Sequence, residues 1–418
     1  MPSLTEPLTT PGFWAGVLEG LEVRLSPRDA RLPRFRELVR SGEALERAGA
    51  WLGGARLSPP HERLLNREGQ GRKKTVYLFE PEDDLLLRGL HHLLHPVVDA
   101  LLPDNCHAFR TGGSARSAFT ALLKDPGLAD KACLRLDVRN YFNSIPPERL
   151  LARLPPPLAG DAPLVRLLEG LLLDPRVRRE SGLAESPKGA MAGTCTAPLL
   201  ANLYLREVDL AFLARGVTYG RYSDDLIVLD EPGRLDAHEA ALRAALAEAG
   251  LVVNEEKSGR SMPGEPWTWL GLRYHRGEID LAPHTAEKLR ARVRRLARRQ
   301  ERRKREPEAA VRRVLRRLDR KLYGGEGAEG ELCWARWFFP VLTTDRTLRE
   351  LDAVIQEKLR FVASGRYARA SHRVLPYERM VSLGYLPLAS AWHAWRDGTE
   401  RYARLGTQRL HSRRPRRG

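Results

Sequence analysis

The sequence predicts an α+β fold, in which short antiparallel strands are followed by a helical C-terminal part. Residues 132–138 (ACLRLDV) alternate in polarity over a length typical of a strand. Residues 219–222 and 226–229 are two further short runs separated by a polar turn, which predicts an antiparallel hairpin. Beyond Pro283 the apolar side chains recur at helical spacing.

The N-terminal part is predicted to hold helices and one strand. Residues 1–70 contain helical segments interrupted by Pro and Gly, and carry no chemical motif. Residues 73–79 (KKTVYLF) are basic and then β-branched and aromatic, which predicts a strand. Pro81 and the three acidic residues after it predict the start of an amphipathic helix that ends at Leu101.

The middle of the chain is predicted to alternate helices with hairpins. Small residues from Gly189 to Gly193 predict a loop that leads into a helix, and Gly250 is typical of a helix end. The expected elements are, in chain order, a Pro-rich segment at 146–163, helices over 164–173, 198–213 and 237–249, a strand that begins at Val252, and a hairpin formed by 267–274 and 278–281.

The C-terminal part is predicted to be helical. Leu and Val residues between 289 and 322 have helical spacing, and Pro307 divides this stretch into two helices. A third helix is expected over 345–359, and a small packed unit over 377–395. The Arg-rich tail is expected to be disordered.

Positive charge is concentrated in one segment. The chain has 70 Lys and Arg against 53 Asp and Glu, a net charge of +17, which favours a polyanionic partner such as nucleic acid. Residues 283–321 contain 17 Lys and Arg and 5 Asp and Glu, so their local net charge of +12 accounts for most of this excess. The alternative is a solvated basic face that reflects codon bias, since Arg greatly outnumbers Lys.

Several classes of protein are excluded by what the sequence lacks. No apolar run reaches the length of a transmembrane helix, and the N-terminus lacks the pattern of a secretory signal. The four cysteines are far apart, which excludes a disulfide framework and a CxxC zinc site and fits a reducing cytoplasm. We therefore expect a cytoplasmic protein without a membrane partner.

Three acidic residues stand out as candidates for metal chemistry. Asp224 and Asp225 are adjacent at a tight turn beside an apolar strand, where like charges repel unless a cation is present. A solvated acidic turn is the simpler explanation for such a pair alone. Asp137, however, ends another predicted strand, and three carboxylates there could hold two Mg²⁺ ions, or Mn²⁺, for an in-line phosphoryl displacement. The lack of a Cys/His cluster argues against zinc.

Six segments resemble the motifs of reverse transcriptases, in the order and at the spacing of that family. Together they cover about residues 72 to 275. They are, in chain order, FRTG at 109–112 in the fingers, LDVRNYF at 136–142 (motif A), GAMAGTCTAPLLAN at 189–202 (motif B), RYSDD at 221–225 (motif C), GLVVNEEKS at 250–258 (motif D) and WLG at 269–271 (motif E).

The resemblance implies a right-hand polymerase with fingers, palm and thumb. The expected divisions are a helical N-terminal extension at 1–70, fingers at 71–131, a palm at 132–282 with an insertion at about 146–187, a basic helical thumb at 283–370, and a small C-terminal unit with an Arg-rich tail at 371–418.

The resemblance also implies roles for individual residues. Asp137 and Asp224 would be metal ligands, with Asp225 supporting them. Phe142 would lie under the sugar and select deoxynucleotides, or else simply pack in the core. The other residues expected to contact the nucleotide are Lys74, Arg110, Gly189, Gly193 and Lys257.

The basic segment is expected to grip nucleic acid through its backbone. Five arginines are off the apolar positions of the predicted helices and should face outward, where they could bind the phosphates of the template–product duplex without reading bases. These residues are Arg290, Arg294, Arg298, Arg312 and Arg316.

The family resemblance predicts an RNA-directed DNA polymerase that uses dNTPs to copy RNA into DNA. Motif B departs from the family pattern at Met191, Ala192 and Ala197, which could change fidelity or template dependence. By elimination, the chain is most similar to stand-alone bacterial enzymes, many of them associated with antiphage defence, that copy a structured non-coding RNA. Alternatives are a retron or CRISPR-associated enzyme, template-independent DNA synthesis, or a non-catalytic RNA-binding scaffold. The oligomeric state is left open.

Overall fold

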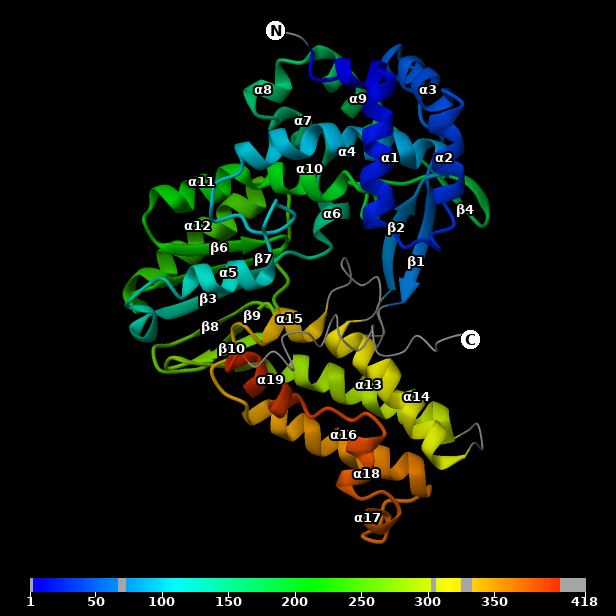
Figure 1. Ribbon diagram of the computed structural model, residues 1–418. Coiled ribbons are helices and arrows are strands. Elements are labelled where there is room, and N and C mark those ends of the chain that lie inside the picture. The colour runs from blue at the N-terminus through cyan, green and yellow to red at the C-terminus, as the bar shows by residue number, and fades with distance from the viewer. Residues whose placement is uncertain (1–2, 67–72, 302–305, 325–332, 399–418) are drawn as a thin grey trace. The chain divides into compact units, whose positions relative to one another are not determined.

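The computed structural model describes residues 3–66, 73–301, 306–324 and 333–398 of the 418-residue chain (Figure 1). The chain divides into two compact units, Met1–Met262 and Pro263–Gly418. The predicted Arg-rich tail lies outside the described residues. Within the described ranges, no helix has both the length and the apolar character needed to cross a membrane.

The first unit begins with helices packed around one long helix, α4, as the sequence predicts. Trp14 lies over Gly89 of α4, where an added Cβ atom would approach the indole ring to 2.5 Å. Glycine in the middle of this helix is therefore explained by close packing. The helices are α1 (Pro11–Arg24), α2 (Leu32–Arg40), α3 (Glu43–Leu52) and α4 (Pro81–Leu101).

A four-stranded sheet in the first unit joins segments that are far apart in the chain. The strand order is β2-β1-β4-β5, with β1 antiparallel to β2 and parallel to β4. The sequence predicts only β2, because β1 (HERLLN) and β4 (RVRR) are poor in the β-branched and aromatic residues that favour strands. The strands are β1 (His61–Asn66), β2 (Lys73–Leu78), β4 (Arg176–Arg179) and β5 (Gly182–Glu185).

The central sheet of the first unit is antiparallel throughout and carries the predicted hairpin. Its order is β6-β7-β3-β8, so the hairpin β6–β7 pairs with β3 through β7. Almost every residue of β3 and β7 is buried, which explains their apolar composition. The strands are β3 (Ala132–Asp137), β6 (Thr218–Tyr222), β7 (Asp225–Asp230) and β8 (Gly259–Ser261).

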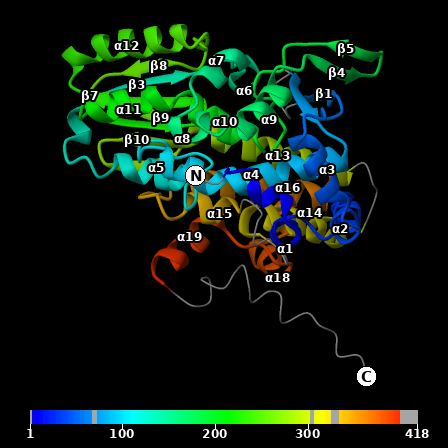
Figure 2. The same cartoon turned by 90° about the horizontal axis from the view of Figure 1, so that it is seen from above.

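Helices cover this sheet and connect it to the rest of the unit (Figure 2). Helix α12 packs on β3 and β7, whereas α5 and α11 pack on β6. The helices are α5 (Ala115–Leu122), α6 (Tyr141–Ser144), α7 (Pro147–Ala152), α8 (Pro156–Ala159), α9 (Ala162–Leu172), α10 (Ala197–Tyr204), α11 (Arg206–Ala214) and α12 (Leu235–Glu248).

Two elements of the first unit differ from the sequence prediction. The helix expected over 198–213 is two helices, because Leu205 leaves the helical conformation with φ −101° and ψ 10°. The strand expected from Val252 is absent. Instead Val253 makes a single bridge to Val138, and the next strand, β8, begins only at Gly259. Backbone pairing to β3 is thus split between two short segments.

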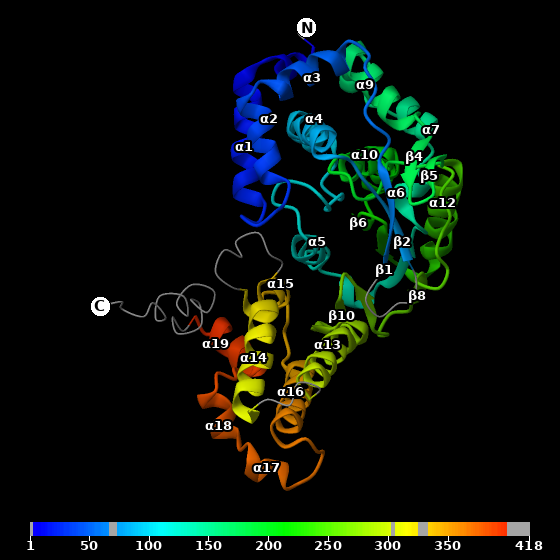
Figure 3. The same ribbon diagram turned by 90° about the vertical axis from the view of Figure 1, so that its right-hand side faces the viewer.

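The second unit combines a small sheet with long helices (Figure 3). The predicted hairpin around residues 276–277 is confirmed as β10–β11, and a further turn at Leu270-Gly271 divides the expected 267–274 strand into β9 and β10. The elements are β9 (Trp267–Trp269), β10 (Leu272–His275), β11 (Glu278–Leu281), α13 (Pro283–Glu301), α14 (Pro307–Tyr323), α15 (Trp334–Phe338), α16 (Arg346–Ser364), α17 (Ser371–Val374), α18 (Tyr377–Ser382) and α19 (Leu388–Arg396).

Antiparallel sheets and separate helices confirm the α+β fold class. The apolar faces predicted for α13 and α14 are buried, as expected. The boundary between the two units, after Met262, falls within the segment 132–282 that the sequence assigns to a palm. The division into fingers, palm and thumb stays a prediction.

Candidate active site

The candidate catalytic carboxylates lie at one end of the central sheet. Strands β6 and β7 pair so that Tyr222 lies opposite Asp225, which leaves a two-residue turn of Ser223 and Asp224. Ser223 has a φ of +63°, in the left-handed region that a tight hairpin turn requires. This conformation is strained for a residue with a side chain, so the surrounding structure must hold the turn in place.

A fully buried ion pair supports this turn. Arg221 and Asp209 are both 0% exposed, and the Arg221 Nε donates to the two carboxylate oxygens at 2.8 and 3.0 Å. The guanidinium also donates to the carbonyl oxygens of Ser223 at 3.3 Å and Asn202 at 3.2 Å. A buried charge without a partner would cost several kcal/mol, so this network fixes the turn relative to α10 and α11.

Asp137 meets the turn from the neighbouring strand. It ends β3 directly opposite Asp225 of β7, so their side chains are on the same face of the sheet. The Val138 N–H donates to the carbonyl oxygen of Asp224 at 3.1 Å, which ties the two segments together. The structure therefore brings Asp137 close to Asp224 and Asp225, which follow it by 87 and 88 positions in the chain, as the sequence predicts.

The segment after α12 supplies partners for Asp137. The Lys257 Nζ contacts the two carboxylate oxygens of Asp137 at 2.8 and 3.0 Å, and the Asn254 side-chain amide donates to one of them at 2.8 Å. The Asn254 backbone N–H donates to the Asp137 carbonyl oxygen at 2.7 Å. Asp137, which is only 4% exposed, therefore has a cation beside it.

The other two carboxylates have no ion pair among the described residues, and the nearby Lys257 offsets their charge only in part. Burial and the neighbouring Asp137 raise the pKa of Asp224 above its usual range. Burial, Asp224 and Asp137 raise the pKa of Asp225 to about 7. Negative charge is thus concentrated at the turn, and a cation that bound there would relieve the repulsion.

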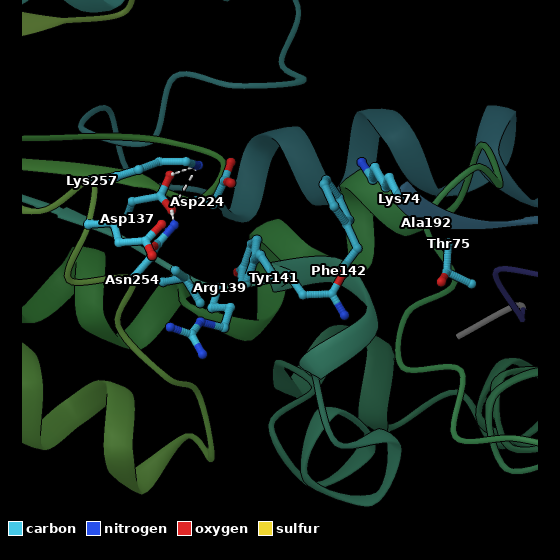
Figure 4. Close-up of a pocket in the computed structure, with 13 residues that line it drawn as sticks. Lys74, Thr75, Asp137, Arg139, Tyr141, Phe142, Ala192, Asp224, Asn254 and Lys257 are labelled. Carbon is cyan, nitrogen blue, oxygen red and sulfur yellow. Dashed lines mark hydrogen bonds and ion pairs between the residues drawn. The ribbon is translucent and has the colours of Figure 1, made fainter. Parts of the chain in front are cut away.

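A cavity of about 520 Å³ opens beside these carboxylates (Figure 4). Asp137, Asp224 and Lys257 lie at one end of it, and Phe142 and Lys74 at the other. The Lys74 Nζ is 5.4 Å from the centre of the Phe142 ring. The remaining lining residues are Thr75, Val138, Arg139, Asn140, Tyr141, Ala192, Asn254 and Glu256. The cavity thus joins acidic and basic groups with the half-buried aromatic ring of Phe142.

Part of the chain is similar to a known protein family. Residues 84–274 match the family described as reverse transcriptase (RNA-dependent DNA polymerase). Among curated proteins, a 158-residue stretch is 27% identical to the uncharacterized 91 kDa protein in the cob intron of Schizosaccharomyces pombe. The match covers 36% of this chain and 18% of that protein.

Solved structures of telomerases are remotely similar to the chain. Telomerase from Candida albicans in complex with a fragment of telomeric RNA matches with a TM-score of 0.44 and 10% identity, over 84% of this chain and 68% of that one. Apo telomerase from Candida tropicalis matches with a TM-score of 0.45 and 11% identity, over 79% and 67%. Similarity at this level carries no inference about activity.

The donor atoms of the candidate site suit a hard divalent cation. Asp137, Asp224 and Asp225 offer only oxygen ligands, which Mg²⁺ and Mn²⁺ prefer. In the parts of the chain that the structure describes, no three or more His, Cys, Asp or Glu side chains are grouped as a ready metal site. The uncompensated charge at the turn, rather than a preformed ligand set, is what fits a cation.

Three of the predicted nucleotide contacts lie outside the cavity. Arg110 donates to Asp99 at 2.8 Å and to the carbonyl oxygen of Pro103 at 2.7 Å, so its guanidinium holds its own loop together. Gly189 and Gly193 have positive φ and abut protein backbone. An added Cβ would lie 2.5 Å from the carbonyl oxygen of residue 142 and 3.0 Å from that of residue 77, respectively. Their lack of a side chain is needed for this packing.

Sequence reasoning missed three positioning groups of the candidate site. The Arg221–Asp209 pair is one, and Asn254 is the second. The third is Asn143, which donates to the carbonyl oxygen of Thr75 at 3.0 Å and accepts from the Ala192 N–H at 2.8 Å. It therefore joins α6 to β2 and to the motif B loop. An arginine within an apolar strand and an Asn after the motif A aromatics were signals that could have been used.

The arginines predicted to face outward on α13 and α14 do so with one partial exception. Arg294, Arg298, Arg312 and Arg316 are exposed, and Arg290 is half-buried. Arg290 pairs with Glu350 at 2.7 Å and Arg294 with Glu287 at 2.8 Å. Among the described residues, Arg298, Arg312 and Arg316 have no ion pair. The charges of these three arginines are therefore available to a ligand.

Proposed function

We propose that this protein is an RNA-directed DNA polymerase that copies an RNA template into cDNA. The observation that carries the proposal is the meeting of Asp137, Asp224 and Asp225 beside a cavity that also contains cations. Phosphoryl transfer needs negative ligands for metal ions and positive groups for the triphosphate within one pocket. This cavity offers both.

Each group of the cavity has a place in the reaction. Asp137 and Asp224 would hold two Mg²⁺ ions, with Mn²⁺ as a substitute, and Asp225 would maintain the negative charge beside them. Such ions neutralise charge on the attacking and leaving oxygens of an in-line displacement. Lys257, which reaches Asp137, and Lys74, over Phe142, would contact the phosphates of the dNTP. Phe142 would exclude a 2′-hydroxyl.

We infer that the template is a structured non-coding RNA and that the role is antiphage defence. The support is the basic segment at 283–321, which suits a polyanion, and the resemblance to stand-alone bacterial reverse transcriptases. A retron or CRISPR-associated enzyme is a second candidate. Template-independent synthesis stays a third, because Ala192 lines the cavity where the family has Gln.

Primer extension tests the proposal. D224A/D225A should abolish Mg²⁺-dependent DNA synthesis on an RNA template while RNA binding is nearly unchanged, since the ligands are lost but the basic helices are intact. E231A/D236A is the matched control, because it removes two exposed acids close in sequence and should leave synthesis unchanged. Full synthesis by D224A/D225A would exclude catalysis at this site and favour a scaffold. Extension without any template would favour the third candidate.

A further inference from the structure

A second basic surface lies beyond the helices that the sequence singles out. Residues 358–376 contain five Lys and Arg and no Asp or Glu. Three of them, Arg366, Arg369 and Arg373, are exposed, and among the described residues their guanidinium groups have no hydrogen-bond or ion-pair partner. We call these three residues the distal arginine triad. Other exposed arginines of the same unit, such as Arg346 and Arg349, are paired with acids.

The backbone beneath the triad is packed rather than loose. The Tyr367 ring stacks on Phe361 of α16 with centroids 4.3 Å apart and planes 8° from parallel. The Ser371 hydroxyl donates to the carbonyl oxygen of Ala368 at 2.6 Å, and Leu375 is 2% exposed. Three charged side chains thus project from an ordered surface, which reduces the entropy lost when a ligand binds them.

The triad lies at the same end of the second unit as the basic end of α13. Helix α13 follows β11 after one residue, and α16 begins where Arg346 pairs with Glu278 of β11. The two helices pack along each other, so both end away from the sheet, where α17 also lies (Figures 1 and 3). Each has 19 residues and is therefore about 28 Å long. Exposed Arg298 and Arg299 end α13 at this tip.

We propose that the distal arginine triad binds the sugar–phosphate backbone of a helical segment of the RNA template. This rests on the proposed function, which requires the protein to hold RNA before any DNA exists. Arginine presents paired N–H groups that match phosphate oxygens, and the three guanidinium groups of the triad have no internal partner among the described residues that would compete with a phosphate. The competing explanation is that these arginines only complement the C-terminal dipoles of α13 and α16.

The test compares two variants that remove equal charge from the same unit. R366Q/R369Q/R373Q removes the triad, whereas R346Q/R349Q/R379Q removes three exposed arginines that pair with Glu278, Asp345 and Glu308. Binding of each to a long RNA hairpin is titrated against salt, without DNA or dNTPs. The slope of log K against log[salt] should fall by about 2 to 3 in the triad variant, at roughly 0.7–0.9 per phosphate, and by less than about 0.5 in the control.

The outcomes separate this inference from the proposed function. Equal slopes in the two variants, or an equal triad effect on a DNA duplex of the same sequence, would overturn the assignment to RNA. A loss of thermal stability without a change in slope would favour the helix-dipole explanation. Addition of one dNTP to a short primer–template should be unchanged in the triad variant, and its absence in the wild type would count against the proposed function alone. R369Q gives a single-site check, with a fall of about 0.7–0.9.

Discussion

The turn of the central sheet and the tip of the second unit differ in the sign of the charge that is left without a partner. In the first unit, Arg221 is fully buried and paired with Asp209, whereas Asp224 and Asp225 have no ion pair among the described residues and have raised pKa values. At the tip of the second unit, Arg366, Arg369 and Arg373 are exposed and have no ion-pair partner among the described residues. Charge that the fold leaves without a partner marks where a ligand of opposite charge is expected: divalent cations at the turn and phosphates at the tip.

The largest effect, a loss of stability, is expected when the buried Arg221–Asp209 ion pair is broken. Replacing Arg221 by Met should destabilise the protein by about 3–5 kcal/mol, because the buried Asp209 carboxylate would lose its partner. Urea unfolding measures this cost. R221M/D209L, which removes both charges, should recover most of the stability but still synthesise DNA slowly, since the Ser223 carbonyl oxygen loses its donor. Wild-type synthesis in a stable double variant would show that the pair acts on folding alone.

The arginines of α13 and α14 sharpen the comparison between paired and unpaired charge. R298Q/R312Q/R316Q should flatten the salt dependence of template–product binding by about 2–3 and shorten the products, while single-nucleotide addition largely survives. R290Q/R294Q should have a much smaller effect per residue, because these two arginines already pair with Glu350 and Glu287. Equal effects per residue in the two variants would show that pairing does not matter. Slopes of both variants identical to that of the wild type would favour a solvated face.

The smallest effect concerns an uncharged wall of the cavity. Phe142→Ala should reduce discrimination between dNTP and rNTP by roughly 10–200-fold, about 1–3 kcal/mol, if the ring excludes the 2′-hydroxyl. Incorporation ratios measure this. Phe109→Ala is the control, because its ring contacts Phe142 edge-on at 6.2 Å but is not part of the cavity lining. A loss of stability with unchanged discrimination would assign Phe142 to packing.

Local patterns were sufficient for much of the fold and for the acids of the site. Strand β3, the hairpin β6–β7 and helix α4 were predicted from the sequence alone. Their apolar side chains recur at the spacing of a strand, two residues, or of a helix, 3.6 residues. The proximity of Asp137 to the Asp224 turn was inferred from its place at the end of a predicted strand, and the pairing of β3 with β7 confirms it. The outward face of α13 and α14 followed from the same local periodicity.

Only the tertiary structure decided the contacts that give these residues their environments. Strand β1 pairs with β4 across more than a hundred positions, and its own composition does not favour a strand. Arg110 turned out to clamp its own loop, and Arg221 to meet Asp209 in full burial. Whether a charge is paired depends on which distant element packs beside it, a property that neither composition nor periodicity encodes, and it is this property that separates the structural charges of this protein from those available to a ligand.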